Sequence, residues 1–563
     1  MELLDAISWA RLRHHYGAAE DVPGLVRGIA SGDAEGAADA WDTLHNLLCH
    51  QGGWVGSAAT ATLPFLFGLA RDPVVAARVE VMETIGGLAE TARTAAPQLV
   101  DDGWAGAWER CRGDVRILLA DGDPAMRRAA VGLLAVGGGP VRENVAWLSE
   151  RWRYEEDVAA RVEVVLALGA VVGAGDLVVP GDGGVSADVR AVLEDLVEGD
   201  APALRLAAVH AWARVDPAVP ARCLGALVEI LAAPDARAAL EAGWADHTIR
   251  HLVTRTYQLL ADEPRSATGL VTGLLAAASD TDVRVAALAE AGSLLMRWRS
   301  PVPVLLPVLG ACLDDPDPGV RLEAAHLLAV LGSAAAPYAD RLADRLHDTG
   351  TGGGTGRGAR RGAATVADTA LWGLTRLGDP RALPGLVERL HAAPRVFGTR
   401  DVHSSERSYF VPTLPGIREV LGPLRAHAGG LLPEVRALMR RVAAADDGET
   451  GRALAGALGE WREDALTEAA VALWAVTGEV EASVAALEET IRPLPEGRCL
   501  PVMLSAVHGL TRIGSFTPAT GEVLRRSLAY DGRLAYWGGW RGFVQDEVMR
   551  AAIRELAEVG RVG

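Results

Sequence analysis

The residues best placed to do chemistry lie in the polar stretch WADHTIRHLVTR. His247, His251 and Arg255 are spaced four residues apart, so on a helix they would share one face. Two histidines at this spacing can chelate a metal ion, and Asp246 or Asp262 could supply a third ligand. The chain has no HExxH motif and no His-Glu dipeptide. We therefore interpret the stretch as a polar helix face, with no metal and no catalytic residue.

This helix face is still a candidate for contact with a partner molecule. It carries tryptophan, histidine, arginine and threonine side chains, and we expect it to line the concave surface of a helical array. The tryptophan lies beside a glycine and polar residues and is expected to be exposed, as interface anchors often are. The predicted contact residues are Trp244, Asp246, His247, Arg250, His251 and Arg255.

A second candidate is the polar, aromatic stretch 394–415, which is too long for an ordinary turn. The surrounding block 357–407 holds nine arginines and five acids, a charge of 9 − 5 = +4 in a chain of −18. Such a block suits an anionic ligand: phosphate, an acidic peptide or nucleic acid. A solvated loop explains the same composition and is the favoured interpretation. The predicted contact residues are Arg400, His403, Arg407 and Tyr409.

A repeated pattern, Asp-x-x-x-Arg-x-x-Ala-Ala-x-x-Leu, indicates the elements that must position these residues. Its clearest copy begins at Asp317, and others begin at Asp123, Asp200 and Asp280. With looser copies at Asp72 and Asp157, neighbouring copies recur every 34 to 51 residues, apart from one double-length gap. This spacing is typical of two-helix repeats.

Each copy contains the signals of a capped, amphipathic helix. The aspartate is a good N-cap, and Val320, Ala324 and Leu327 fall on one helical face. The arginine recurs at one position, and we expect it to pair with the capping aspartate of its own or the next repeat. These arginines are Arg78, Arg127, Arg161, Arg205, Arg284 and Arg321.

The sequence DPGVRLEAAHLLAVLG, from Asp317 to Gly332, resembles bacterial HEAT repeats of the short type also found in phycobilin-lyase-like proteins. The resemblance implies an all-α fold, a right-handed α-solenoid of about ten to twelve two-helix repeats. We predict an N-terminal array over 1–346, a flexible Gly-rich loop over 347–362, and a C-terminal array over 363–563 that contains the 394–415 insertion.

Composition excludes several classes of function. All 55 basic residues are arginines, which excludes lysine Schiff-base chemistry and the lysine-containing P-loop. The net charge of −18 disfavours a protein that wraps nucleic acid. Five scattered cysteines without a CxxC pair fit a reducing compartment. With no signal peptide core or membrane span expected, we predict a cytoplasmic protein without a cofactor.

These observations favour a non-enzymatic scaffold that binds a protein or peptide on its concave face. One alternative is a protein acting on nucleic acid, because alkylpurine DNA glycosylases can be built from HEAT-like repeats. Trp244, Asp246 and Arg250 are the nearest imitation of the residues that such enzymes use. Another alternative is a regulatory or immunity-type protein that masks the active site of a second protein.

Overall fold

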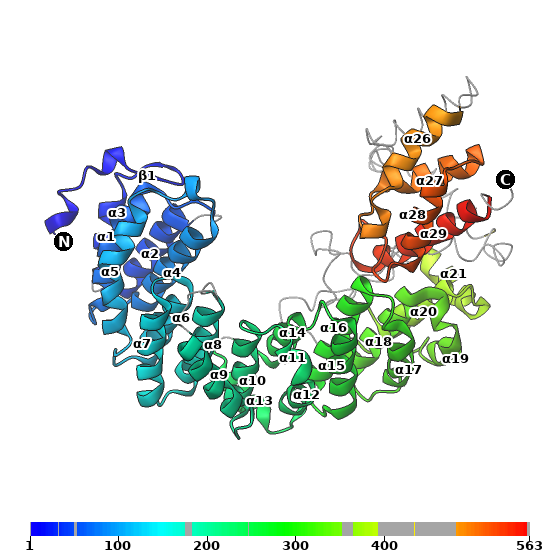
Figure 1. Ribbon diagram of the computed structural model, residues 1–563. Helices are drawn as coiled ribbons and strands as arrows, with labels where there is room; N and C mark the ends of the chain where they lie inside the picture. The colour runs from blue at the N-terminus through cyan, green and yellow to red at the C-terminus, as the bar shows by residue number, and fades with distance from the viewer. Residues whose placement is uncertain are drawn as a thin grey trace. The chain divides into compact units, whose positions relative to one another are not determined.

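The computed structural model describes residues 2–31, 33–49, 53–174, 183–245, 247–351, 364–391, 433 and 480–559. Its contacts divide the chain into two compact units, Met1–Leu259 (unit 1) and Leu260–Gly563 (unit 2). Regular structure in the described residues is almost entirely helical (Figure 1), apart from a short ribbon of β1 (Arg13–His14) and β2 (Gly17–Ala18). The predicted all-α class is confirmed.

Unit 1 is a stack of helix pairs. The first helices of the pairs are α1 (Val22–Ile29), α3 (Ser57–Arg71), α5 (Trp104–Leu118), α7 (Val141–Tyr154), α9 (Gly183–Val197) and α12 (Leu224–Ala232). The second helices are α2 (Ala34–Cys49), α4 (Arg78–Thr94), α6 (Pro124–Val136), α8 (Val158–Ala174), α10 (Pro202–Ala213) and α14 (Ile249–Gln258). From α2 to α10 each second helix packs on the next, while the short helices α11 (Val219–Arg222) and α13 (Ala236–Gly243) lie between α10 and α14 in the chain.

Unit 2 continues with the same kind of pair. The pairs are α15 (Pro264–Ala277) with α16 (Thr281–Arg297), α17 (Val302–Cys312) with α18 (Pro318–Leu331), and α19 (Ala339–Asp344) with α20 (Val366–Arg376). After α21 (Leu383–His391) come α26 (Val480–Ile491), α27 (Pro501–Ile513), α28 (Pro518–Ala529) and α29 (Gly539–Val559). Short 3-10 turns are η1 (Glu2–Leu4), η2 (Trp9–Arg11), η3 (Pro97–Leu99), η4 (Gly332–Tyr338), η5 (Pro380–Ala382) and η7 (Leu494–Glu496).

The repeated aspartate caps most of the second helices in which it was expected to do so. Asp123, Asp280 and Asp317 each accept a backbone N–H from the first turn of α6, α16 and α18, and Asp157 accepts the N–H of Ala160 in α8. Asp200 was expected to cap α10, but the N-cap there is the next residue in the chain, an alanine. The extra residue between Asp200 and its arginine moves the aspartate off the cap position.

The repeated arginine joins each pair to the next. Arg127 in α6 donates to the carbonyls of Asp121 and Gly122 in its own repeat, at 3.0 and 3.1 Å. It also makes two 2.8 Å hydrogen bonds with the Glu155 carboxylate, in the turn before α8. Glu155 in turn accepts the backbone N–H of the capping residue Asp157 at 3.0 Å. One arginine therefore fixes two successive turns and the cap of the next helix.

The prediction of an arginine ladder is correct, but its acidic partner was misassigned. Where the next helix begins with a capping aspartate, the partner lies two residues before that aspartate. Three pairs follow this rule: Arg78–Asp121, Arg127–Glu155 and Arg284–Asp315. Arg205 pairs with Glu229 and Arg321 with Asp348, where the next second helices are capped by threonine. Arg161 has no acidic partner among the described residues; its guanidinium lies 4.3 Å from the centre of the Trp152 ring.

Close packing between second helices depends on small residues. A Cβ at Gly169 in α8 would lie 2.3 Å from the Ala211 carbonyl oxygen in α10, and one at Gly173 would lie 2.4 Å from the Arg214 carbonyl oxygen. Backbone atoms cannot move aside cheaply, so these two glycines set the distance between the helices.

The apolar stripe predicted in α18 is buried, with Val320, Ala324 and Leu327 fully inaccessible. One helical stretch among the described residues, Pro318–Asp344, is long and apolar enough to cross a membrane. However, 78% of its apolar window is buried inside the fold, where α18 packs between α16 and α20. The stretch is therefore a core element of the helical array.

The division into two units falls within the predicted N-terminal array, at Leu259/Leu260. The predicted Gly-rich loop over 347–362 and the insertion over 394–415 lie largely or wholly outside the described residues, so the predicted boundaries remain predictions.

Removing one acid of the ladder should destabilise the fold. Glu155 is fully buried and pairs with Arg127 and Arg151. We expect Glu155→Ala to lower the free energy of unfolding by about 3 kcal/mol, because it leaves two mostly buried arginines, Arg127 and Arg151, without their acidic partner. The control is Glu150→Ala, which breaks an exposed 3.8 Å pair with Arg116 and should cost less than about 0.5 kcal/mol. Urea denaturation followed by circular dichroism measures both; equal effects would contradict the role of the ladder.

The same acids predict a loss of stability in acid. Burial alone would raise the pKa of Glu155 and Asp121, but hydrogen bonds, chiefly from Arg127 and Arg78, hold each pKa below its ordinary value of 4.5 or 3.8. The hydrogen bond from Arg321 likewise lowers the pKa of Asp348. The unfolded chain then takes up these protons first, so stability is complete above about pH 5 and falls as pH drops through 4 and below. Urea titrations from pH 7 to pH 3 test this; stability that rises on acidification would refute it.

Candidate binding site

Trp244 is a buried part of the predicted contact region. Its side chain is only 3% exposed, so the expectation that it is exposed is wrong. Its indole N–H donates to the Ala203 carbonyl in α10 at 3.2 Å, and its ring meets His210 edge-on at 5.1 Å. The neighbouring Gly243, which suggested an open turn, is packed against Ala203 instead. Trp244 is therefore a buried residue that packs on α10, and it is not available for contact with a partner.

The two histidines occupy the start of α14. His247 precedes the helix, which begins at Ile249 after the N-cap Thr248, so His247 and His251 do not share a helical face as predicted. His251 completes a capping box with Thr248, whose hydroxyl accepts the His251 N–H while the His251 ring accepts the Thr248 N–H. The two imidazoles still lie close, with ring centres 6.3 Å apart.

Arg255 joins this group from the next turns of α14. Its guanidinium lies over the Trp244 ring at 5.4 Å, within cation–π distance. Its Nη1 lies 2.7 Å from Nε2 of His247, and Nδ1 of His247 lies 2.9 Å from the Ala245 carbonyl oxygen. These partners assign the His247 proton to Nδ1, so that Nε2 accepts from Arg255 and the imidazole is neutral. The arginine is thus held in position by a ring face and a neutral histidine.

Two second helices add charge to the same region. Burial raises the pKa of Glu163 in α8, against the opposing charges of Arg255 and Arg128. In the described structure Glu163 makes no direct ion pair with Arg128 or Arg255. The two guanidinium groups and the carboxyl group therefore influence one another electrostatically without closing into a salt bridge.

Beneath these groups the polar contacts are structural. His210 is buried, and its Nε2 lies 3.0 Å from the hydroxyl of Thr256 in α14. Burial, assisted by Arg255 and Arg214, lowers the pKa of His210 to about 3, so this imidazole stays neutral. It links α10 to α14, and its ring packs against the ring of Trp244.

The remaining predicted contact residues fall into two groups. Arg250 lies half-buried in α14, while Asp246, Arg400, His403, Arg407 and Tyr409 lie outside the described residues. Within the basic block, Arg376 pairs with Glu547, and Arg381 pairs with Asp340 and Asp379. These two arginines are therefore already engaged by acids of the chain itself.

The described polar groups at α14 are engaged by other parts of the chain. Across the described parts of the chain no group of three or more His, Cys, Asp or Glu side chains is arranged to hold one. Nε2 of His247 is engaged by Arg255 and Nδ1 of His251 by Thr248, while Asp262 pairs with Arg297. The side chain that stands out at α14 is the Arg255 guanidinium, which lies over the Trp244 ring and can donate hydrogen bonds to a bound anion.

No family model and no curated protein matches the chain. Among solved structures, importin beta matches 95% of this chain and 65% of its own length, at 12% identity and a TM-score of 0.40. The UNC-45 chaperone matches 89% of this chain and 57% of its own, at 14% identity and a TM-score of 0.28. An engineered protein matches 67% of this chain and 95% of its own, at 18% identity and a TM-score of 0.27. The first two are helical solenoids of the HEAT and armadillo type.

Trp244 and Arg255 should respond differently to substitution. Trp244→Ala opens a cavity at a buried site, so we expect a loss of about 3–5 kcal/mol in the free energy of unfolding. Arg255→Ala removes a half-buried side chain whose contacts are a ring and a neutral imidazole, so we expect a loss below about 1 kcal/mol. Thermal and urea unfolding measure both. A large loss with Arg255→Ala would show that this arginine holds the fold and is not there to bind.

Proposed function

We propose that the chain is a non-enzymatic scaffold that binds a protein or peptide partner through the second helices of unit 1. The proposed contact residues are His247, Arg250, His251 and Arg255, with Arg128 and Glu163 beside them. Trp244 has a supporting role, because it is buried beneath Arg255.

The observation that carries this proposal is the state of Arg255. Its guanidinium is fixed by Trp244 and His247, yet it makes no ion pair with an acid among the described residues. A guanidinium that is already oriented loses little rotamer entropy when it binds, and it can take a carboxylate in two parallel hydrogen bonds. The partner group that suits it best is an aspartate or glutamate side chain or a C-terminal carboxylate.

The alternative of a protein acting on nucleic acid receives less support at this site. The resemblance to the residues of HEAT-like DNA glycosylases relied on Trp244, Asp246 and Arg250, but Trp244 is buried and hydrogen-bonded inside the fold. A regulatory or immunity-type inhibitor differs from a scaffold only in the identity of its partner. That alternative is compatible with the same surface.

A binding experiment with matched arginine variants tests the proposal. The full-length protein is used to capture a partner from its host extract, and the purified partner is then titrated by calorimetry. Arg255→Ala should weaken binding by about tenfold or more, because a hydrogen bond to a charged group contributes at least that factor. The control is Arg93→Ala, an exposed arginine in the last turn of α4, which should bind as the wild type does.

Two results would refute the proposal. One is an unchanged affinity for Arg255→Ala, and the other is a weakening of the same size in Arg93→Ala, which would indicate a non-specific charge effect.

A further inference from the structure

The last described helices of unit 2 form a body with its own core. We call α26 to α29, residues 480–559, the C-terminal module. Its cluster of buried apolar side chains, which includes Leu487, Leu510 and Ile553, draws all its members from residues between Val484 and Leu556. The partly buried apolar residues packed on this cluster also lie within the module. This cluster is therefore formed without residues of the repeat array.

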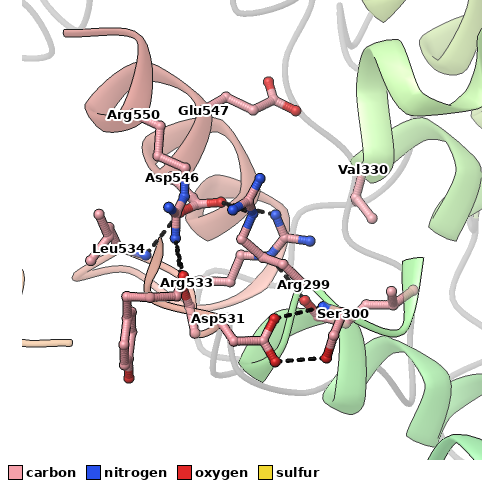
Figure 2. Close-up of polar contacts among 12 residues, drawn as sticks. Arg299, Ser300, Val330, Asp531, Arg533, Leu534, Asp546, Glu547 and Arg550 are labelled. Atoms are coloured by element: carbon pink, nitrogen blue, oxygen red, sulfur yellow. Dashed lines mark hydrogen bonds and ion pairs between the residues drawn. The ribbon is translucent and has the colours of Figure 1, made fainter. Parts of the chain in front are cut away.

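A buried acid organises the polar side of the module. Asp546 in α29 accepts from Arg533 at 2.9 Å, from Arg550 at 2.7 Å and from the backbone N–H of Leu534 at 3.0 Å (Figure 2). Arg550 also donates to four backbone carbonyls between Ser527 and Gly532. These contacts fix the segment between α28 and α29 to the module itself.

The same segment meets the array at the end of α16. Asp531 accepts from the Ser300 N–H at 2.8 Å and the Ser300 hydroxyl at 2.6 Å, and its carbonyl accepts the Arg299 N–H at 2.9 Å (Figure 2). Arg533 donates to the Leu295 carbonyl at 3.0 Å. Leu295 lies in the last turn of α16, where carbonyls lack partners within the helix.

A second group of contacts lies at the end of α18. Arg376 of α20 donates to the carbonyls of Ala329 and Val330, and to Glu547 of the module at 3.2 Å. The Trp540 ring of the module meets Trp372 of α20 at 5.8 Å, nearly perpendicular. The module thus covers Trp372 and the C-terminal ends of two second helices.

The contacts within the module and those to the array differ in kind. The module is held together by buried apolar side chains, whereas its contacts to the array combine hydrogen bonds and partly exposed ion pairs with two apolar contacts, Trp540 on Trp372 and Gly542 on Met296. Such polar contacts contribute modestly and weaken with salt. We infer that the C-terminal module is a releasable cover: it separates from the ends of α16 and α18 as a folded body and exposes Trp372 and the Leu295 carbonyl of α16. The exposed surface would suit a segment of a partner that carries an arginine and an aromatic residue, as the module itself does.

Hydrogen–deuterium exchange on the full-length protein tests this inference, which is independent of the proposed function. Asp531→Ala removes both bonds to Ser300 and leaves the Asp546 cluster intact. We expect backbone amides in 296–302 and 529–537 to exchange about tenfold faster, while amides in α27 keep their protection. Raising NaCl from about 50 to 500 mM should shift the wild type in the same direction.

Two controls separate release from unfolding. Ser300→Ala removes one of the same bonds from the array side, where it cannot affect folding of the module, and should give a smaller change of the same sign. Asp340→Ala breaks an exposed pair with Arg381 and should leave the exchange in both segments unchanged. Equal loss of protection in α27, or no change in 296–302 with either variant, would overturn the inference.

Discussion

The bridging arginine is the interaction on which the rest of the array depends. A two-helix repeat cannot bury its apolar face alone, so its position on the next repeat must be fixed. Arg127 does this by binding two carbonyls of its own turn and the carboxylate of Glu155 in the next. Because Glu155 also accepts the N–H of Asp157, the same contact positions the cap of α8. The offset between repeats and the start of each helix are thereby coupled.

The sequence shows the arginine of this interaction clearly, but not its acidic partner. The arginine recurs at one spacing after its aspartate, and that regularity predicts a ladder. The acidic partner is harder to recognise, because it varies between Asp and Glu and belongs to a turn of variable length. Asp121, Glu155 and Asp315 share only their place two residues before a capping aspartate. That acid-x-Asp signal is readable once the role of the arginine is known.

The candidate site shows where helical periodicity stops being informative. A spacing of four places His247, His251 and Arg255 together only if one helix includes them all, and α14 begins after His247. They meet nonetheless, because Trp244 folds against α10 and offers its ring to Arg255. The hydrogen bond from the Trp244 indole to the Ala203 carbonyl joins residues 41 positions apart in the sequence. No local pattern encodes such a contact, so the burial of Trp244 could not be predicted.

Arg255 differs from the other arginines that fix the ends of helices. In unit 2, Arg376 and Arg533 bind the carbonyls that end α18 and α16, and each also meets an acid of the C-terminal module. In unit 1, Arg255 has a ring and a neutral imidazole as partners, with no acid among the described residues. A half-buried guanidinium without a counter-ion gains most from an incoming carboxylate. In a chain of net charge −18, where acids are plentiful, none of the acids in the described part of the chain forms an ion pair with Arg255, and this favours unit 1 as the surface that receives an acidic partner.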